Sequence, residues 1–158
     1  LSERLQVPVV SSGEVFRQIA QERGLSLSEL GAMCESNPDV DREVDERMRK
    51  ASESMESGIF EGRLAAHFAA ADLRVWLKAP PSVRAERIAQ REGVDAREAL
   101  ALMLERESSE KKRYEQYYGI DIDDLGAYDV VLDSHVFDPL QLTDVVMCCI
   151  EVLSLVGR

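Results

Sequence analysis

Two arginines and a glutamate share one face of a charged segment in the second half of the chain. Arg106, Glu110 and Arg113 follow an i, i+4, i+7 spacing within the run 104–119, which contains no proline or glycine before Gly119. Residues at this spacing lie on one side of an α-helix. Arginine binds phosphate oxygens through two parallel N–H donors and keeps its charge. The pattern predicts either a phosphate-binding face or a solvent-exposed helix held by ion pairs.

A serine, a glycine and an arginine follow the apolar run 7–10, which predicts a buried strand. Ser12 can donate from both its hydroxyl and its backbone N–H at the start of a helix, where anions bind favourably. Gly13 comes next, and Arg17 lies about one helical turn further on, pointing back toward that start. This arrangement predicts an anion site, although a simple helix cap beside a surface arginine would have the same residues.

A second polar group, Glu61, Gly62 and Arg63, follows the short apolar run 59–60. A carboxylate at a strand end beside a phosphate site can hold a water molecule bound to Mg²⁺. Gly62 permits a close approach of the backbone to a ligand. Arg63 places a positive charge at the same edge. The alternative is an ordinary polar turn between a strand and a loop.

A third group of cations, Arg84, Arg87 and Arg91, is spaced i, i+3 and i+7 on one predicted helix. An acidic chain that places its arginines on a few helix faces concentrates positive charge locally. A polyphosphate ligand would explain this concentration. The alternative is a solvated helix whose arginines are neutralised by neighbouring glutamates.

The elements that must position these residues alternate between short apolar runs and helical segments. Strands are predicted near 7–10, 59–60, 72–78 and 128–132, and helices at 14–23, 26–36, 39–57, 82–92 and 138–153. A further helix is predicted at 95–104, continuous with or close to the helical run 104–119. This alternation predicts an α/β fold in which a three-layer parallel sheet is flanked by helices. In such sheets ligands bind beyond the carboxyl ends of the strands, where the polar groups above are expected.

Length and charge restrict the class of protein. The 158 residues fit one domain, and the net charge is 19 − 30 = −11, which disfavours non-specific binding to nucleic acid. No apolar run approaches the ~20 residues of a membrane span. Cys148 and Cys149 are adjacent in an apolar segment and are predicted to be small core residues rather than parts of a disulfide or metal site. We therefore expect a cytoplasmic protein without nucleic-acid or membrane partners, with a monomer favoured.

Taken together, the polar groups resemble those of nucleoside monophosphate kinases. Residues 11–17 resemble that group's Ser-x-Gly-Asp-x-x-Arg stretch, and residues 106–113 match its lid pattern Arg-acid-x-x-acid-x-x-Arg. Residues 61–64, 72–80 and 117–125 resemble the archaeal type of cytidylate (CMP) kinase. The matches occur in the same order as in that family and cover essentially the whole chain.

The resemblance implies a P-loop kinase fold and transfer of the γ-phosphoryl group of ATP to CMP or dCMP, with Mg²⁺, to form CDP or dCDP. Such a transfer needs no protein nucleophile, because positioning and charge neutralisation supply the catalysis. Two alternatives stay open: another small-molecule or nucleotide kinase, of the adenylate or shikimate type, and a non-catalytic nucleotide-binding module.

The resemblance also implies roles for individual residues. The catalytic group would comprise Arg63, Arg106, Arg113 and Glu61, with Glu61 reaching a metal ion through water. The acceptor would be bound by Ser12, Gly13, Arg17, Gly62, Asp41, Asp45, Arg47 and Glu110. The donor nucleotide would be faced by Arg87 and Arg91.

The implied organisation is one kinase domain, 1–158, with core segments 1–13, 58–90 and 125–158, an acceptor-binding insertion at 14–57 and a lid at 91–124. The family begins with a strand and a glycine-rich P-loop, and the glycines of this chain are isolated. We expect a truncation that removes that strand and loop, about 20 residues, and a chain that is inactive by itself.

Overall fold

The computed structural model of the chain describes residues 1–155; residues 156–158, the end of the predicted core segment 125–158, lie outside it. The helices and strands are, in chain order, α1 (Ser2–Leu5), β1 (Val9–Ser11), α2 (Ser12–Glu22), α3 (Leu27–Ser36), α4 (Asp39–Ser54), β2 (Ile59–Glu61), α5 (Ala65–Phe68), β3 (Val75–Lys78), α6 (Pro81–Glu92), α7 (Ala96–Tyr118), the 3₁₀ turn η1 (Leu125–Ala127), β4 (Val130–Asp133) and α8 (Pro139–Leu155). The predicted order of strands and helices is confirmed.

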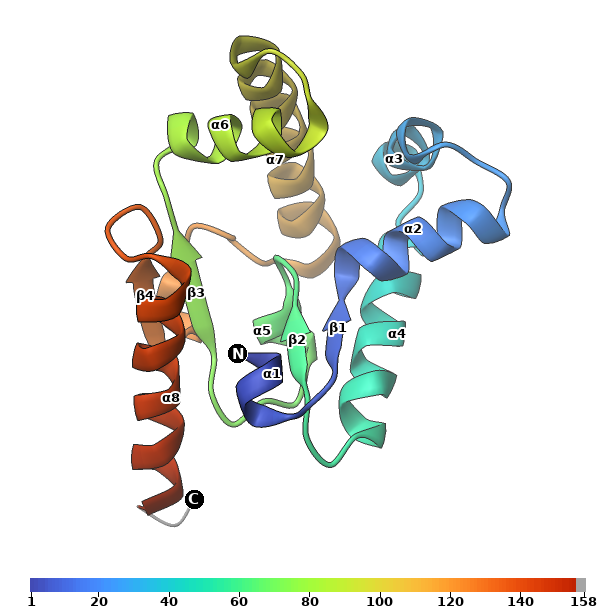
Figure 1. Cartoon of the computed structure of the whole chain (residues 1–158). Helices are drawn as coiled ribbons and strands as arrows, with labels where there is room; N and C mark the ends of the chain where they lie inside the picture. The colour runs from blue at the N-terminus through green and yellow to red at the C-terminus, as the bar shows by residue number, and fades with distance from the viewer. Residues whose placement is uncertain (156–158) are drawn as a thin grey trace.

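The strands form two parallel pairs. In the first pair Val9 of β1 lies opposite Ile59 of β2, and in the second Val75 of β3 lies opposite Val130 of β4. The described residues thus form two two-stranded sheets instead of the single three-layer sheet expected. The carboxyl ends of both pairs point toward the helical part that contains α2, α6 and α7 (Figure 1). The residues that follow the strands are therefore gathered at one end of the molecule.

The main apolar core lies in the insertion and not between sheet layers. Its buried side chains come from three helices: Val15, Ile19 and Ala20 of α2, Leu30 and Cys34 of α3, and Val40, Val44 and Met48 of α4. The α4 positions repeat at helical spacing and form a thin apolar stripe on this charged helix. Ser26 caps α3 in a reciprocal arrangement with Glu29.

The segment 104–119 belongs to one long helix, α7. The carboxylate of Asp95 accepts hydrogen bonds from the backbone N–H groups of Arg97 and Glu98 at its start. Gly119 ends it with φ 66°, a left-handed conformation that glycine adopts without steric cost. Small side chains, Ala85 and Ala89 of α6 and Ala99 of α7, are buried where the two helices pack.

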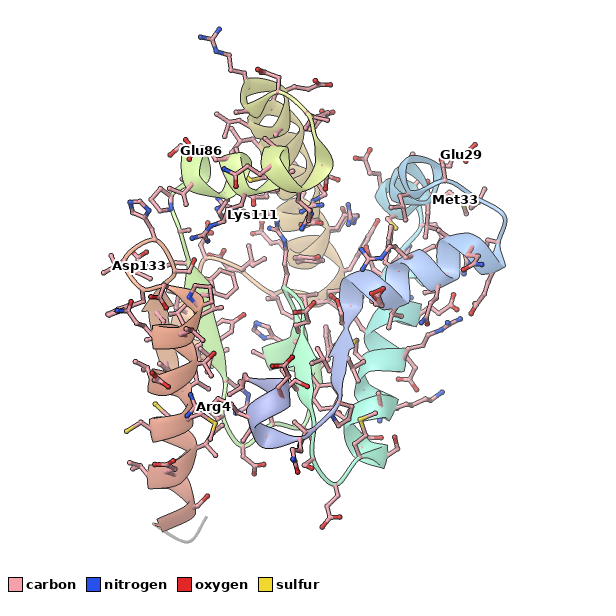
Figure 2. All side chains as sticks on the ribbon, viewed as in Figure 1. Arg4, Glu29, Met33, Glu86, Lys111 and Asp133 are labelled. Atoms are coloured by element: carbon pink, nitrogen blue, oxygen red, sulfur yellow. The ribbon has the colours of Figure 1, made fainter. Side chains whose placement is uncertain are left out.

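Burial is lower than predicted in the strands and in α8. Val9 and Leu77 are 49% and 54% exposed, because a pair of two strands is too narrow to be covered on both faces. Cys148 is exposed and Cys149 half-buried, so the prediction that both are core residues is wrong. The carboxylate of Asp144 ties α8 to Arg4 of α1, which lies between the two helices in Figure 2. No helix among residues 1–155 combines the length and apolarity needed to span a membrane.

Candidate active site

The first two polar groups meet where β1 and β2 end. Ser11 and Glu61 are directly opposite in the parallel register, so Ser12 and Gly62 follow side by side. A Cβ atom on Gly62 would lie 2.8 Å from the Cβ of Ser12 and closer still to its Oγ. Gly62 is therefore required for this close approach and not for a turn. Ser11, not Ser12, caps α2, which leaves the Ser12 hydroxyl free of the capping role.

Arg17 lies over the beginning of α2, as its spacing predicted. Its Nη1 would be 3.8 Å from a Cβ built on Gly13, and its Nη2 donates to Glu14 Oε2 at 2.8 Å. The side chain is 56% exposed. Such an exposed ion pair holds the guanidinium only weakly, so Arg17 can turn toward an anion at the helix start.

Arg63 connects the end of β2 with α7. Its Nη2 donates to Glu107 Oε1 at 3.0 Å, and its Nε lies 2.8 Å from Glu110 Oε2. The hydroxyl of Tyr128 donates to the Arg63 carbonyl at 3.4 Å. These contacts join residues that are far apart in the chain and place a half-buried guanidinium between the strand ends and the predicted lid.

Glu107 is the first acidic residue of the lid pattern, but the sequence reasoning assigned it no role in the site. It accepts hydrogen bonds from Arg63 and from Arg84, and Arg84 also donates to the Ala79 carbonyl at 3.1 Å. Burial opposes its ionisation, but the hydrogen bonds and charges of both arginines outweigh burial and hold the pKa of Glu107 below its ordinary value. The signal was present: Glu107 lies three residues before Glu110, on the same helix face.

Glu110 has one buried oxygen without a satisfactory donor. Although Arg63 Nε is close to its Oε2, the alignment is too poor for a hydrogen bond, and no other described group donates to this atom. Arg106 Nε is 3.5 Å from the other oxygen, and the Arg106 side chain is 63% exposed. A buried carboxylate oxygen that lacks a donor is costly, so it favours a ligand that carries one.

Arg113 connects α7 with the insertion. Its Nε donates to Asp41 Oδ2 at 2.8 Å and its Nη1 to Ser109 Oγ at 2.8 Å. The Arg113 and Asp41 side chains are only 13% and 11% exposed. Arg113, predicted to be catalytic, is therefore paired with Asp41, which is predicted to bind the acceptor.

Asp45 lies one helical turn beyond Asp41 and accepts a hydrogen bond from the hydroxyl of Tyr118. Burial raises the pKa of Asp45 to about 6, despite that hydrogen bond, and the negative charge of Asp41 adds to the increase. Arg47 points elsewhere: it pairs with Glu22 at 2.6 Å and with Glu43, which joins α4 to α2. Arg47, also predicted to bind the acceptor, thus pairs with glutamates and not with the partners of Asp41 and Asp45.

The remaining predicted residues are spread over the strand ends and α6. Arg87 donates to the Oγ of Ser134, after β4, at 2.9 Å. Arg91 is exposed and pairs with its neighbour Glu92 at 2.7 Å. Glu61 is exposed at the end of β2. Among residues 1–155, no three His, Cys, Asp or Glu side chains are placed to hold a metal ion by themselves.

Comparison with known proteins places this arrangement in a family. The model described as "Cytidylate kinase-like family" matches residues 1–136. Proteins named cytidylate kinase are 47% identical in Methanothrix thermoacetophila, over 98% of this chain and 89% of the relative, and 45% identical in Methanosarcina barkeri, over 99% and 88%. A third, from Methanothermobacter thermautotrophicus, is 48% identical over 87% and 86%. The crystal structure of an uncharacterized protein from Eubacterium ventriosum is similar in fold, with a TM-score of 0.68 at 20% identity, over 96% of this chain and 87% of that one.

Proposed function

The chain belongs to the cytidylate kinase-like family, and from this premise we propose that it transfers the γ-phosphoryl group of ATP to CMP, and to dCMP, forming CDP or dCDP. The main structural observation that supports this proposal is the position of Arg63. Arg63, at the end of β2, meets the lid helix α7 directly beside the Ser12–Gly62 contact. A guanidinium between strand ends and a movable helix is suited to a phosphate that must be enclosed.

We propose that the two strand pairs belong to one parallel sheet of the P-loop kinase type. Both pairs are parallel, and their carboxyl ends face the same way (Figure 1). The predicted division supports the same arrangement: residues 14–57 contain the core built by α2, α3 and α4, and residues 91–124 contain α7. These would be the acceptor-binding insertion and the lid.

The acceptor phosphate would be bound at the start of α2. Ser12 and Gly13 offer backbone N–H groups there, and Gly62 permits the phosphate to approach the end of β2. Arg17 and Arg63 would supply the two guanidinium groups. Because Arg17 is exposed and Arg63 half-buried, Arg17 would move to the ligand while Arg63 stays in place.

Glutamates now occupy the positions that phosphate oxygens would take in the complex. Glu110 and Glu107 each pair with Arg63, and exchange of these carboxylates for phosphate would let α7 close with Arg106 and Arg113. The transfer breaks the bond from the γ-phosphorus to its bridging oxygen and forms a bond to an acceptor phosphate oxygen. The arginines would neutralise charge that develops along this line.

The donor side would involve Arg87, which Ser134 holds near β4, and the exposed Arg91. The family reaction implies Mg²⁺, and Glu61 fits it as an isolated, exposed oxygen donor, since Mg²⁺ keeps most of its waters and takes one or two carboxylates. Bound there through water, the ion would neutralise phosphate charge. Glu61 would only orient that water.

The test is an acceptor panel. ADP formation should be measured for the complete gene product with ATP, Mg²⁺ and CMP, dCMP, UMP or AMP at equal concentrations. We expect CMP and dCMP to give the highest kcat/KM. Turnover that is equal or better with AMP, or absent with CMP, would overturn the proposal.

A further inference from the structure

Arg84 is an arginine next to the candidate site to which the proposed reaction assigns no role. It lies in the first turn of α6, and its Nε donates to the carbonyl of Ala79, directly after β3, at 3.1 Å. Its Nη1 donates to Oε1 of Glu107 on α7. The guanidinium is therefore held at two points, one at a strand end and one on the proposed lid helix.

The arginines of α6 do not form one charged face, although their spacing predicted it. Arg87 donates to Ser134, after β4. Arg91 is exposed and pairs with its neighbour in sequence. Arg84, in contrast, reaches Glu107 of α7. The three side chains thus have separate surroundings, and the contact with α7 needs an explanation of its own.

Two arginines share one carboxylate oxygen of Glu107. Its Oε1 accepts from Arg63 Nη2 at 3.0 Å and also from Arg84 Nη1. The Glu107 side chain is only 18% exposed, so solvent compensates little of its charge. Burial opposes its ionisation, and the hydrogen bond from Arg84 is the largest of the contacts that keep the pKa of Glu107 below its ordinary value. Arg84 is therefore the main partner of this carboxylate.

The acceptor phosphate and Glu107 would compete for Arg63. If Arg63 were the single partner of Glu107, its transfer to a phosphate would leave a largely buried carboxylate uncompensated beside a second anion, which is strongly unfavourable. With Arg84 in place, Glu107 loses one of two donors and keeps the other. The second arginine therefore lowers the free-energy cost of releasing Arg63.

Glu110, the other carboxylate beside Arg63, has a weaker second partner. Arg106 Nε is 3.5 Å from Glu110 Oε1, and the Arg106 side chain is 63% exposed. Solvent screens such a contact. The Arg84 side chain is 34% exposed and is fixed at both of its ends. Of the two second partners, Arg84 is the one that can keep its carboxylate in place while Arg63 changes its ligand.

We propose that Arg84 is a positioning residue that retains Glu107 when Arg63 binds the acceptor phosphate. This inference rests on the proposed function. Arg84 acts through Glu107 and not on a substrate, and no covalent bond changes at either residue. Its effect falls on acceptor binding, because retention of Glu107 makes Arg63 available before the phosphoryl group is transferred.

Steady-state kinetics of the complete gene product separate acceptor binding from the transfer step. We expect Arg84→Ala to raise the KM for CMP about tenfold, with kcat and the KM for ATP changed less than about threefold. Arg97→Ala, which removes an exposed arginine from the first turn of α7, is the matched control and should leave all three values unchanged. An unchanged KM for CMP in Arg84→Ala, or a loss confined to kcat, would overturn the inference.

The Glu107→Gln background distinguishes a positioning role from a structural one. Glutamine carries no charge, so Arg63 can leave it without the help of Arg84. In this background Arg84→Ala should change the KM for CMP less than about twofold, because the two residues are coupled. A residue that only supports the fold would raise the KM by the same factor in both backgrounds, and that result would overturn the inference.

A conservative variant keeps the inference testable if Arg84→Ala fails to fold, as monitored by circular dichroism. Arg84→Lys retains the charge without the two fixed donors, so the KM for CMP should rise about threefold with Glu107 present and stay unchanged in Glu107→Gln. No rise, or an equal rise in both backgrounds, would overturn only the role of Arg84. A native gene product that does not turn over CMP would overturn the proposed function as well.

Discussion

Every arginine proposed to bind the acceptor or to close with α7 is paired with a carboxylate of its own chain. Arg17 pairs with Glu14, Arg63 with Glu107 and Glu110, and Arg113 with Asp41. An arginine held by a carboxylate is oriented before a phosphate arrives, and the like charge of the phosphate can replace that of the carboxylate. At the residue scale the site is therefore a set of exchangeable ion pairs.

Replacement of Arg63, which pairs with both Glu107 and Glu110, tests whether these ion pairs belong to the phosphate-binding site. Arg63→Ala should lower kcat/KM of the complete gene product by about 10²–10³, the range for loss of one charge-stabilising donor group. The melting temperature should change little, because Glu107 would still pair with Arg84 and Glu110 would still pair with Arg106. Arg63→Lys, which retains the charge without the paired donors, should recover part of the rate. A large fall in melting temperature with activity retained would contradict the assignment.

Gly62→Ala tests the contact between β2 and α2. The new Cβ would lie 2.8 Å from the Cβ of Ser12, so backbone must shift. We expect a loss of about 1–3 kcal/mol in the free energy of unfolding and weaker CMP binding. Gly31→Ala is the matched control: nothing lies within 4 Å of its Cβ position, and alanine favours the helix. Urea titration of both variants measures their free energies of unfolding. If Gly62→Ala were as stable as Gly31→Ala, the close contact of Gly62 with Ser12 would not require glycine.

At the scale of elements, α7 connects the end of β2 with α6, α3 and α4. One face of the helix meets the end of β2 through Arg63 and α6 through Arg84, and its last turns meet α3 and α4. The hydroxyl of Tyr117 donates to the Cys34 carbonyl at 3.3 Å, beside the Arg113–Asp41 pair. The helix α7 thus contacts both α3 and α4, and the closure of α7 proposed above would have to break or exchange these contacts.

Among these contacts of α7, the Arg113–Asp41 ion pair is the one to test, because both side chains are largely buried. Removing one partner of a largely buried pair leaves the other charge without compensation. We expect Arg113→Ala to reduce the free energy of unfolding by roughly 2–3 kcal/mol, with the double variant Arg113→Ala/Asp41→Ala less affected than the sum of the two single changes.

The exposed Arg49–Glu53 pair on α4 provides the comparison. Its removal should change stability little, because solvent screens it. Urea unfolding of the four proteins in the Arg113–Asp41 cycle gives the coupling directly. Strict additivity in that cycle would show that the pair does not join lid and insertion.

At the scale of the whole molecule, the net charge is −11, but within the candidate site the arginines and carboxylates pair with one another. Three arginines lie on each of α4, α6 and α7, where neighbouring carboxylates pair with several of them, whereas residues 121–151 contain eight carboxylates and no lysine or arginine. The apolar core is in the insertion, whereas the strands and α8 are partly exposed. The apolar core of the described residues is therefore concentrated in the helices α2, α3 and α4, whereas the strands are only partly covered.

Stability should depend on pH through Asp45. Burial keeps this carboxyl protonated in the folded state up to about pH 6, whereas the unfolded chain releases the proton near its ordinary value of 3.8. The native state binds more protons in this window, so the contribution of Asp45 to the free energy of unfolding decreases as pH rises from about 4 to 6. The neighbouring charges of Asp41, Glu46, Arg42 and Arg49 and the Tyr118 hydroxyl modulate the window.

The Asp45→Asn variant has no carboxyl group at this position, so folding no longer changes the number of protons bound there. We expect the variant to lose less stability than the native chain between pH 4.5 and 7, roughly the interval set by that pKa shift. Urea unfolding at both pH values measures the difference between the two proteins. If native and variant respond identically to pH, Asp45 does not titrate in the folded protein as assigned.

The sequence by itself determined the order of the main helices and strands, the helical run that ends at Gly119, and the family. These features depend on helical and strand periodicity, caps and glycine positions, which act over a few neighbouring residues. That this helical run and the segment before it form the single helix α7 was left open. The motif residues Ser12, Gly62 and Arg63 were also predictable, because each follows a strand in a parallel fold.

Only the tertiary structure decided which charges meet. Arg63 pairs with Glu107 across 44 positions, Arg113 with Asp41 across 72, and Tyr118 with Asp45 across 73. No local pattern specifies such a pair, since the packing of α7 against α4 and the strand ends brings the partners together. The same long-range packing buries Asp45 and leaves Val9 and Cys148 exposed, because burial depends on which elements cover a residue and not on how apolar its neighbours in sequence are.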